Sequence, residues 1–174
     1  MCDIRLVHSA RIERVVLGCL IMQPEGIKEA RQLVTSEDFY YRADKIIFDS
    51  LCEMDGQGLT IDLVLVCHFL EQRGLLGEVG GATYIASLVD ALPKAEIKNV
   101  PFYCFEIHLL GLLRDIQKQA CRIATSEDRY SLIEHIQIIQ SKIEKALNFY
   151  NNKKEIAANE GRDAKSKWSE VVNG

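Results

Sequence analysis

The sequence predicts an all-α protein in which a globular helical bundle is followed by a long antiparallel helical hairpin. Apolar residues recur every three or four positions along most of the chain, the spacing of a buried helix face. Capping residues, glycines and prolines separate these periodic segments at ordinary helix lengths. From residue 95 onward, two much longer periodic segments follow each other with only a short polar break. We therefore place the globular bundle at 1–93, the hairpin at 94–150 and a polar tail, which starts a linker helix, at 151–174.

Five segments predict the helices of the bundle. The first spans 9–26, with Ser9 as its N-cap and Pro24 at its end. The second covers 25–34 and is followed by Thr35 and Asp38, which have the spacing of a capping box that opens a short turn. The remaining three segments are 42–58, 60–74, which begins with the capping residues Thr60 and Asp62, and 81–93, which Pro93 closes.

The hairpin is predicted from two apolar stripes on consecutive long segments. Asn99 is the expected cap of its first helix, with Pro101 in the first turn, where the missing N–H costs little. Leu109 and Leu112 widen the apolar face of this helix, which favours self-association; docking onto the chain's own globular part is the alternative. The residues expected to pack the hairpin and pair subunits are Ile107, Leu110, Leu113, Ile116, Ile136, Ile139 and Ile143.

The tail is polar except for Trp168, Val171 and Val172. Their spacing would form a short apolar helical turn, which is either a partner-binding or linker helix or an isolated aromatic in a disordered end. Trp168 is therefore a further candidate interface residue.

Bulk composition narrows the function. The 174 residues are 48% hydrophobic and 26% charged, with a formal net charge of −4. Because nucleic-acid affinity comes largely from neutralising phosphates, we expect weak or absent DNA binding by this chain alone. No apolar stretch is long enough to span a bilayer and no secretory signal begins the chain, which predicts a cytoplasmic protein without membrane contact. The six cysteines lie in apolar segments and are expected to be reduced.

No motif in the sequence indicates catalysis. The stretch 73–85, RGLLGEVGGATYI, is rich in glycine, but no glycine in the chain is followed by lysine, as a Walker A loop requires. We interpret it as a turn between two helices, with Gly74 as the helix stop. Cys104 and His108 could share a helix face toward a metal, but no second ligand pair accompanies them. A small helical enzyme or metal protein is therefore only a third hypothesis, and we expect no catalytic, cofactor or metal residue.

The order of the segments resembles the N-terminal domain of replicative DNA helicases of the DnaB type. The forms E-x-x-V-L-G-x-x-L (with one position's slack), E-D-F-Y with I-F-x-x-L, I-D-x-V-x-V-x-x-x-L, G-x-L-x-x-V-G-G-x-x-Y-I and L-R-x-I occur in that order. The matching residues are Glu13, Val16, Leu17, Gly18 and Ile21; Glu37, Asp38, Phe39, Tyr40, Ile47, Phe48 and Leu51; Ile61, Asp62, Val64, Val66 and Leu70; Gly74, Leu76, Val79, Gly80, Gly81, Tyr84 and Ile85; and Leu113, Arg114 and Ile116. The second hairpin helix matches only in pattern, and the entry NVPFYCF departs from the family.

This resemblance implies a domain whose hairpins pair between subunits, forming a collar above the ATPase ring of a hexamer. It also implies contacts with primase and the helicase loader. The family's motor domain, which uses ATP and Mg, is not in this sequence, so helicase activity is not carried over and no cofactor is expected. Our first hypothesis is a non-catalytic collar domain for oligomerisation and partner docking in DNA replication, as a helicase fragment or a separately encoded relative. The alternative is a stand-alone regulator of this fold that binds or inhibits a replicative helicase.

Overall fold

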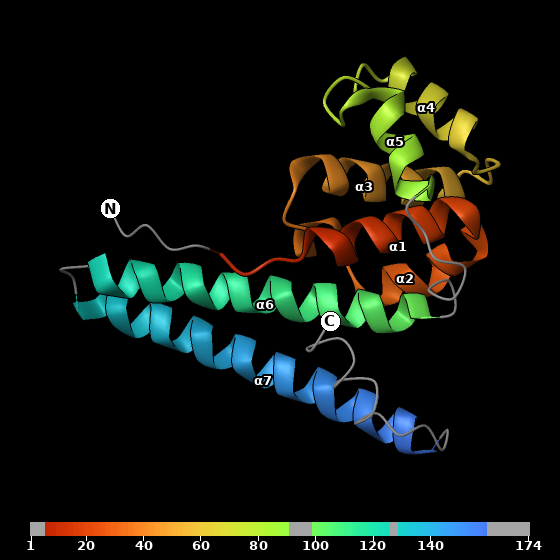
Figure 1. Cartoon of the computed structure of the whole chain (residues 1–174). Helices are drawn as coiled ribbons and strands as arrows, with labels where there is room; N and C mark the ends of the chain where they lie inside the picture. Colours follow the sequence, from red (N-terminus) through yellow and green to blue (C-terminus); the bar gives the residue numbers. More distant parts are fainter. Residues whose placement is uncertain (1–5, 91–98, 126–128, 160–174) are drawn as a thin grey trace. The chain divides into compact units, whose positions relative to one another are not determined.

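The structure, a computed structural model, describes residues 6–90, 99–125 and 129–159, and in these ranges every regular element is helical (Figure 1). This confirms the predicted all-α class. The α-helices are α1 (Ala10–Met22), α2 (Ile27–Leu33), α3 (Arg42–Gly56), α4 (Leu63–Gln72), α5 (Gly81–Asp90), α6 (Val100–Thr125) and α7 (Arg129–Asn159). Two 3₁₀ turns, η1 (Pro24–Gly26) and η2 (Ser36–Asp38), flank α2. No described helix is long and apolar enough to cross a membrane.

Side-chain caps begin the helices where the sequence predicts them. The Ser9 hydroxyl accepts from the amide of Ile12 at the start of α1, and the Asp62 carboxylate accepts from the amide of Leu65, at 2.8 Å, at the start of α4. Such bonds satisfy amides that have no partner inside the helix. Thr35 and Asp38 form the expected capping box at η2, which confirms the predicted short turn.

The glycine-rich stretch is a joint between α4 and α5. Gly74, Gly80 and Gly81 have φ values of 69°, 88° and 75°, in the left-handed region that side chains with a Cβ rarely adopt. The amide of Gly81 donates to the carbonyl of Leu76 at 2.9 Å, which closes the turn. The structure therefore confirms the interpretation of this stretch as a connection between two helices.

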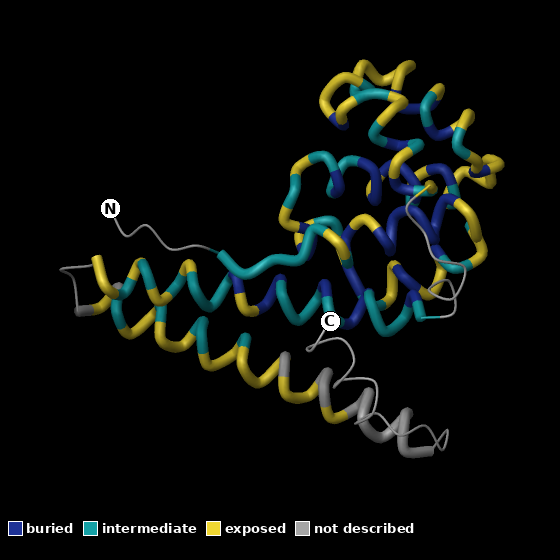
Figure 2. The backbone as a smooth tube through the Cα atoms, viewed as in Figure 1, coloured by how far each residue is buried: buried dark blue, intermediate teal, exposed yellow. Residues whose placement is uncertain are grey.

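The described helices fall into two compact units. The first, Arg5–Asp115, contains α1 to α5 and most of α6 around one apolar core, in which α1 packs against α3 and α5 (Figures 1 and 2). Its fully buried side chains include Val16, Leu17, Leu20, Ile27, Ile47, Leu51, Leu70, Ile85, Leu88, Cys104 and Ile107. The second unit contains the end of α6 and α7.

Two boundaries differ from those expected. The sequence places the end of the globular part at residue 93, where helix length changes, whereas the first compact unit continues to Asp115 because the start of α6 supplies core residues. In addition, α7 continues to Asn159, into the segment expected to be a polar tail. Residues 151–159, NNKKEIAAN, contain no glycine or proline, the residues that most strongly end a helix.

Candidate functional site

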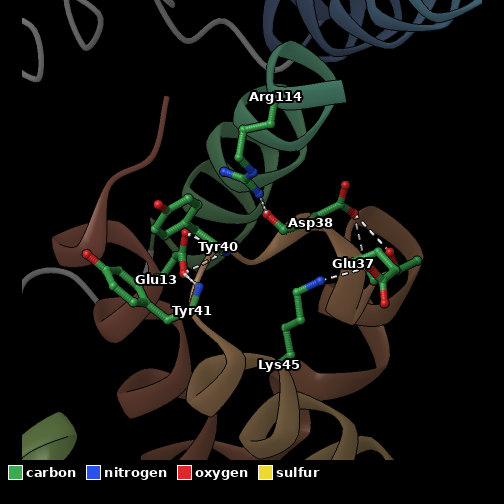
Figure 3. Close-up of polar contacts among 8 residues, drawn as sticks. Glu13, Glu37, Asp38, Tyr40, Tyr41, Lys45 and Arg114 are labelled. Carbon is green, nitrogen blue, oxygen red and sulfur yellow. Dashed lines mark hydrogen bonds and ion pairs between the residues drawn. The ribbon is translucent and has the colours of Figure 1, made fainter. Parts of the chain in front are cut away.

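A buried carboxylate on α1 holds the loop that leads into α3 (Figure 3). Glu13 is 1% exposed, and its carboxylate oxygens accept from the amide of Tyr40 at 3.0 and 3.1 Å and from that of Tyr41 at 3.4 Å. Tyr41 is the N-cap residue of α3, so the carboxylate satisfies amides at the positive end of that helix. Glu13 thereby joins the loop to α1.

A buried guanidinium on α6 holds the same loop from the other side. Arg114 donates to the backbone carbonyl of Asp38 (Figure 3). Its Nη1 also donates to the carbonyl of Val7 at 3.1 Å. Its guanidinium carbon lies 5.8 Å from the centre of the Tyr40 ring. Burial lowers the pKa of Arg114, while the carboxylates of Glu13 and Asp38 oppose this change. Because arginine stays protonated in proteins, a buried positive charge links α6 to the loop and to the N-terminal segment.

The approach of α6 to this loop depends on Gly111. A Cβ added at Gly111 would lie 2.6 Å from Asp38 Oδ1 and 3.1 Å from Asp38 Cα. Real Cβ atoms essentially never come that close to another heavy atom, so any larger residue would displace the loop or the helix. Neither this contact nor the burial of Glu13 was predicted from the sequence.

Cys104 packs in the core, and His108 contacts Asp38. The Cys104 side chain is fully buried in the core. His108 Nδ1 lies 3.2 Å from Asp38 Oδ2, so this imidazole faces the loop. Within residues 6–90, 99–125 and 129–159, no group of three or more His, Cys, Asp or Glu side chains is arranged to hold a metal ion.

The predicted interface residues occupy different environments. Ile107 is 1% exposed and belongs to the globular core, because the first part of α6 packs onto that core. Leu110, Ile116 and Ile139 are half-buried, and Trp168 lies outside the described residues. The exposed members of the set are Leu113, Ile136 and Ile143. The placement of Ile107 thus differs from the expected one, and it leaves that side chain inside its own chain.

An apolar face runs along α7. Ile133, Ile136, Ile143 and Leu147 are 54%, 46%, 42% and 55% exposed. Their spacings of three, seven and four residues place them on one side of an α-helix. We call these four residues the α7 stripe. Contiguous exposed apolar residues of this kind are typical of protein contact surfaces.

A smaller apolar patch lies at α4. Val64, at 73%, and Leu65 are exposed there, together with Leu59 in the preceding segment. The sequence did not predict this patch, because Val64 and Leu65 continue the apolar run of the helix and only the fold shows which of them are covered. It is a second surface on which a partner could dock.

Comparison with known proteins shows one family. A family model described as DnaB-like helicase N terminal domain matches residues 5–108. A "Replicative DNA helicase DnaB" from Geobacillus stearothermophilus is 29% identical over 87% of the chain. The match covers 32% of that relative, so the chain spans about a third of its length.

Solved structures show the same likeness. The N-terminal domain of the DnaB helicase from Mycobacterium tuberculosis is 26% identical, with a TM-score of 0.70, over 81% of this chain and 99% of that one. A DnaB-like replicative helicase, in a structure whose description includes its interactions with primase, has a TM-score of 0.60. At 19% identity, over 84% of this chain and 35% of that one, the second likeness concerns the fold alone.

Proposed function

This chain belongs to the DnaB-like helicase N-terminal domain family, and from that premise we propose that it is a non-catalytic collar domain. It pairs with copies of itself and docks partner proteins during DNA replication. ATP and Mg are bound by a motor domain, and this chain needs no cofactor. The single observation that carries the proposal is the α7 stripe, four large apolar residues left exposed on one helix.

Burial of the α7 stripe supplies the driving force for pairing. Covering one such apolar side chain is worth at most about 1.5–3 kcal/mol, and less for residues that are already half-covered. The contributions of four such side chains on each copy add together against the entropic cost of association, which they must exceed for the pair to form. A second copy of the chain presents the same stripe, so two stripes related by a two-fold axis are self-complementary.

Primase and the helicase loader are the proposed protein partners. A solved DnaB-like helicase of similar fold is described with its interactions with primase, which supports primase as the first partner to test. A net charge of −4 favours contacts with proteins over binding to DNA. The α4 patch is a candidate site for such a partner, separate from the α7 stripe.

Light scattering coupled to gel filtration tests the pairing. We expect the wild-type chain to be a dimer or larger at micromolar concentration. Ile136→Glu should shift it to monomer, because an unpaired charge would be buried in the pair. Ser141→Glu is the matched control, since it adds the same charge to an exposed position on another side of α7 and should leave the pair intact. A wild-type chain that stays monomeric throughout would refute the pairing.

A further inference from the structure

Three helices of the globular unit meet at two buried acids. Asp44, in the first turn of α3, has no exposed surface, and Glu13 on α1 is 1% exposed. The Tyr84 hydroxyl on α5 donates to Asp44 Oδ1 at 2.6 Å. Asp44 Oδ2 is also buried, and no residue that the structure describes forms a hydrogen bond with it. Asp44 and Glu13 also lie close enough for each to affect the ionisation of the other, so two acids from α1 and α3 share a buried region beside a phenol from α5.

One buried cation, Arg114, faces these acids, and a single positive charge can balance only one of two negative charges. Arg14 on α1 faces Asp44 and lies 5.6 Å from the Tyr84 ring, but it is exposed to solvent. Arg114 on α6 faces Glu13, yet its hydrogen bonds go to backbone carbonyls. The Tyr40 and Tyr41 amides donate to the Glu13 carboxylate, whereas Asp44 Oδ1 accepts from the Tyr84 hydroxyl. If both acids were ionised, Asp44 would carry a buried negative charge, and its Oδ2 would have no hydrogen-bond partner among the described residues.

We propose that Glu13 and Asp44 hold one proton between them in the folded protein at a pH where both carboxyls of the unfolded chain are ionised, and that losing this proton loosens the packing of α1, α3 and α5. Like charges in one buried site cannot both ionise easily, so the two groups titrate as a pair. A protonated carboxyl also supplies a donor in a region where both groups are otherwise acceptors. The packing of α1, α3 and α5 around these two acids is thereby sensitive to pH.

Burial decides whether the folded protein becomes more or less stable as pH rises. Burial raises the pKa of Glu13 above its ordinary value of 4.5, and the charge of Asp44 raises it further, while the two amides oppose the change. Burial also raises the pKa of Asp44 above 3.8, against the hydrogen bond from Tyr84. Because the folded-state pKa is the higher one, the stabilisation is complete below about pH 4 and is lost as pH rises through the folded-state value.

The experiment measures the urea unfolding of the full chain between pH 5 and 8 at constant ionic strength. Where only the folded state keeps the proton, the unfolding equilibrium constant should rise up to about tenfold per pH unit. Asp44→Asn keeps an acceptor for Tyr84 but removes the ionisable group, so this dependence should largely disappear. Glu106→Gln is the matched control, since burial raises the pKa of Glu106 separately on α6. Glu106→Gln should not change the part of the pH dependence of unfolding that comes from Glu13 and Asp44.

A measurement on the unaltered protein keeps the proposal testable if Asp44→Asn does not fold. Carboxyl ¹³C chemical shifts assigned to Glu13 and Asp44 report their ionisation directly. We expect the pair to lose its last proton at a pH above the ordinary pKa values of 4.5 and 3.8 of the two carboxyls. Ionisation of both groups at those ordinary values, or a pH dependence unchanged in Asp44→Asn, would overturn the proposal.

Discussion

Gly111→Ala should destabilise the globular unit, although alanine is the better helix former. The new Cβ would lie 2.6 Å from Asp38 Oδ1 and 3.1 Å from Asp38 Cα. Asp38 cannot withdraw freely, because its carboxylate accepts from the Thr35 amide at 2.9 Å and faces His108, while its carbonyl accepts from Arg114. Gly111 itself lies in the interior of α6. The substitution therefore forces either the loop or the helix to move.

Two opposing free energies decide the size of the effect. Replacing a helix-interior glycine by alanine gains about 1 kcal/mol in helix propensity. Overpacking a close contact by one methyl group costs about 1–3 kcal/mol. Because the nearest obstacles are a hydrogen-bonded carboxylate and a backbone atom, we expect the cost to lie in the upper half of that range. The net loss in the free energy of unfolding is then about 1–2 kcal/mol.

Urea unfolding followed by circular dichroism at 222 nm measures this difference. Gly56→Ala is the matched control, because Gly56 is the last residue of α3 and a Cβ there meets nothing within 4 Å. We expect Gly56→Ala to be neutral or slightly stabilising. If Gly111→Ala were as stable as wild type, or gained the stability expected from helix propensity alone, α6 would not approach the loop as closely as described.

Two further predictions concern the polar contacts of the same unit. Arg114→Met should lower the free energy of unfolding by about 2–4 kcal/mol, because it removes the donor to the buried Asp38 carbonyl and to the partly buried Val7 carbonyl, and Arg114→Lys should recover part of the loss. Equal stability of Arg114→Met and wild type in urea would contradict this. Asp62→Ala should cost about 1 kcal/mol by removing the cap of α4, and Asp62→Asn, which also caps helices, should retain most of the stability in the same assay.

Local signals predicted much of the fold. Ser9, Asp62 and the pair Thr35 and Asp38 were predicted as caps because capping is decided by residues three positions apart. The joint at Gly80 and Gly81 was predicted for the same reason, since only glycine enters its backbone conformation freely. Caps and turns depend on residues a few positions apart, so their patterns can be recognised in a single sequence.

Long-range contacts could not be predicted in the same way. Glu13 occupies a position on α1 that periodicity alone assigns to solvent or to the edge of the core, and its partners lie 27 and 28 residues away. Ile107 continues the apolar stripe of a long helix, so its use in the globular core depends on how far α6 packs there. The one available signal was Arg114, which directly follows the apolar run LLGLL, since a charge placed beside such a run indicates a buried partner.

The polar residues that identify the family serve the interior of the globular unit. Glu13 holds the amides that follow Asp38, Arg114 holds the Asp38 carbonyl, and Tyr84 binds Asp44 on the helix that follows this loop. These short motifs are distant in the sequence but act on one loop and on the helix that begins after it. They therefore identify the fold, and they carry little information about which protein the domain meets.

The surface proposed for pairing lies elsewhere. The family match ends at residue 108, whereas the α7 stripe begins at Ile133 and extends to Leu147. These side chains are about half exposed, so replacing one removes little core packing, and the proposed pair is what such a change should affect. Variants of Ile136 and Ile143 should consequently weaken association with little loss of folding stability. Variants of Glu13 and Arg114 should lower folding stability and leave the pairing surface unchanged. This separation follows because the contacts that hold the globular unit and those proposed to join its copies involve different residues.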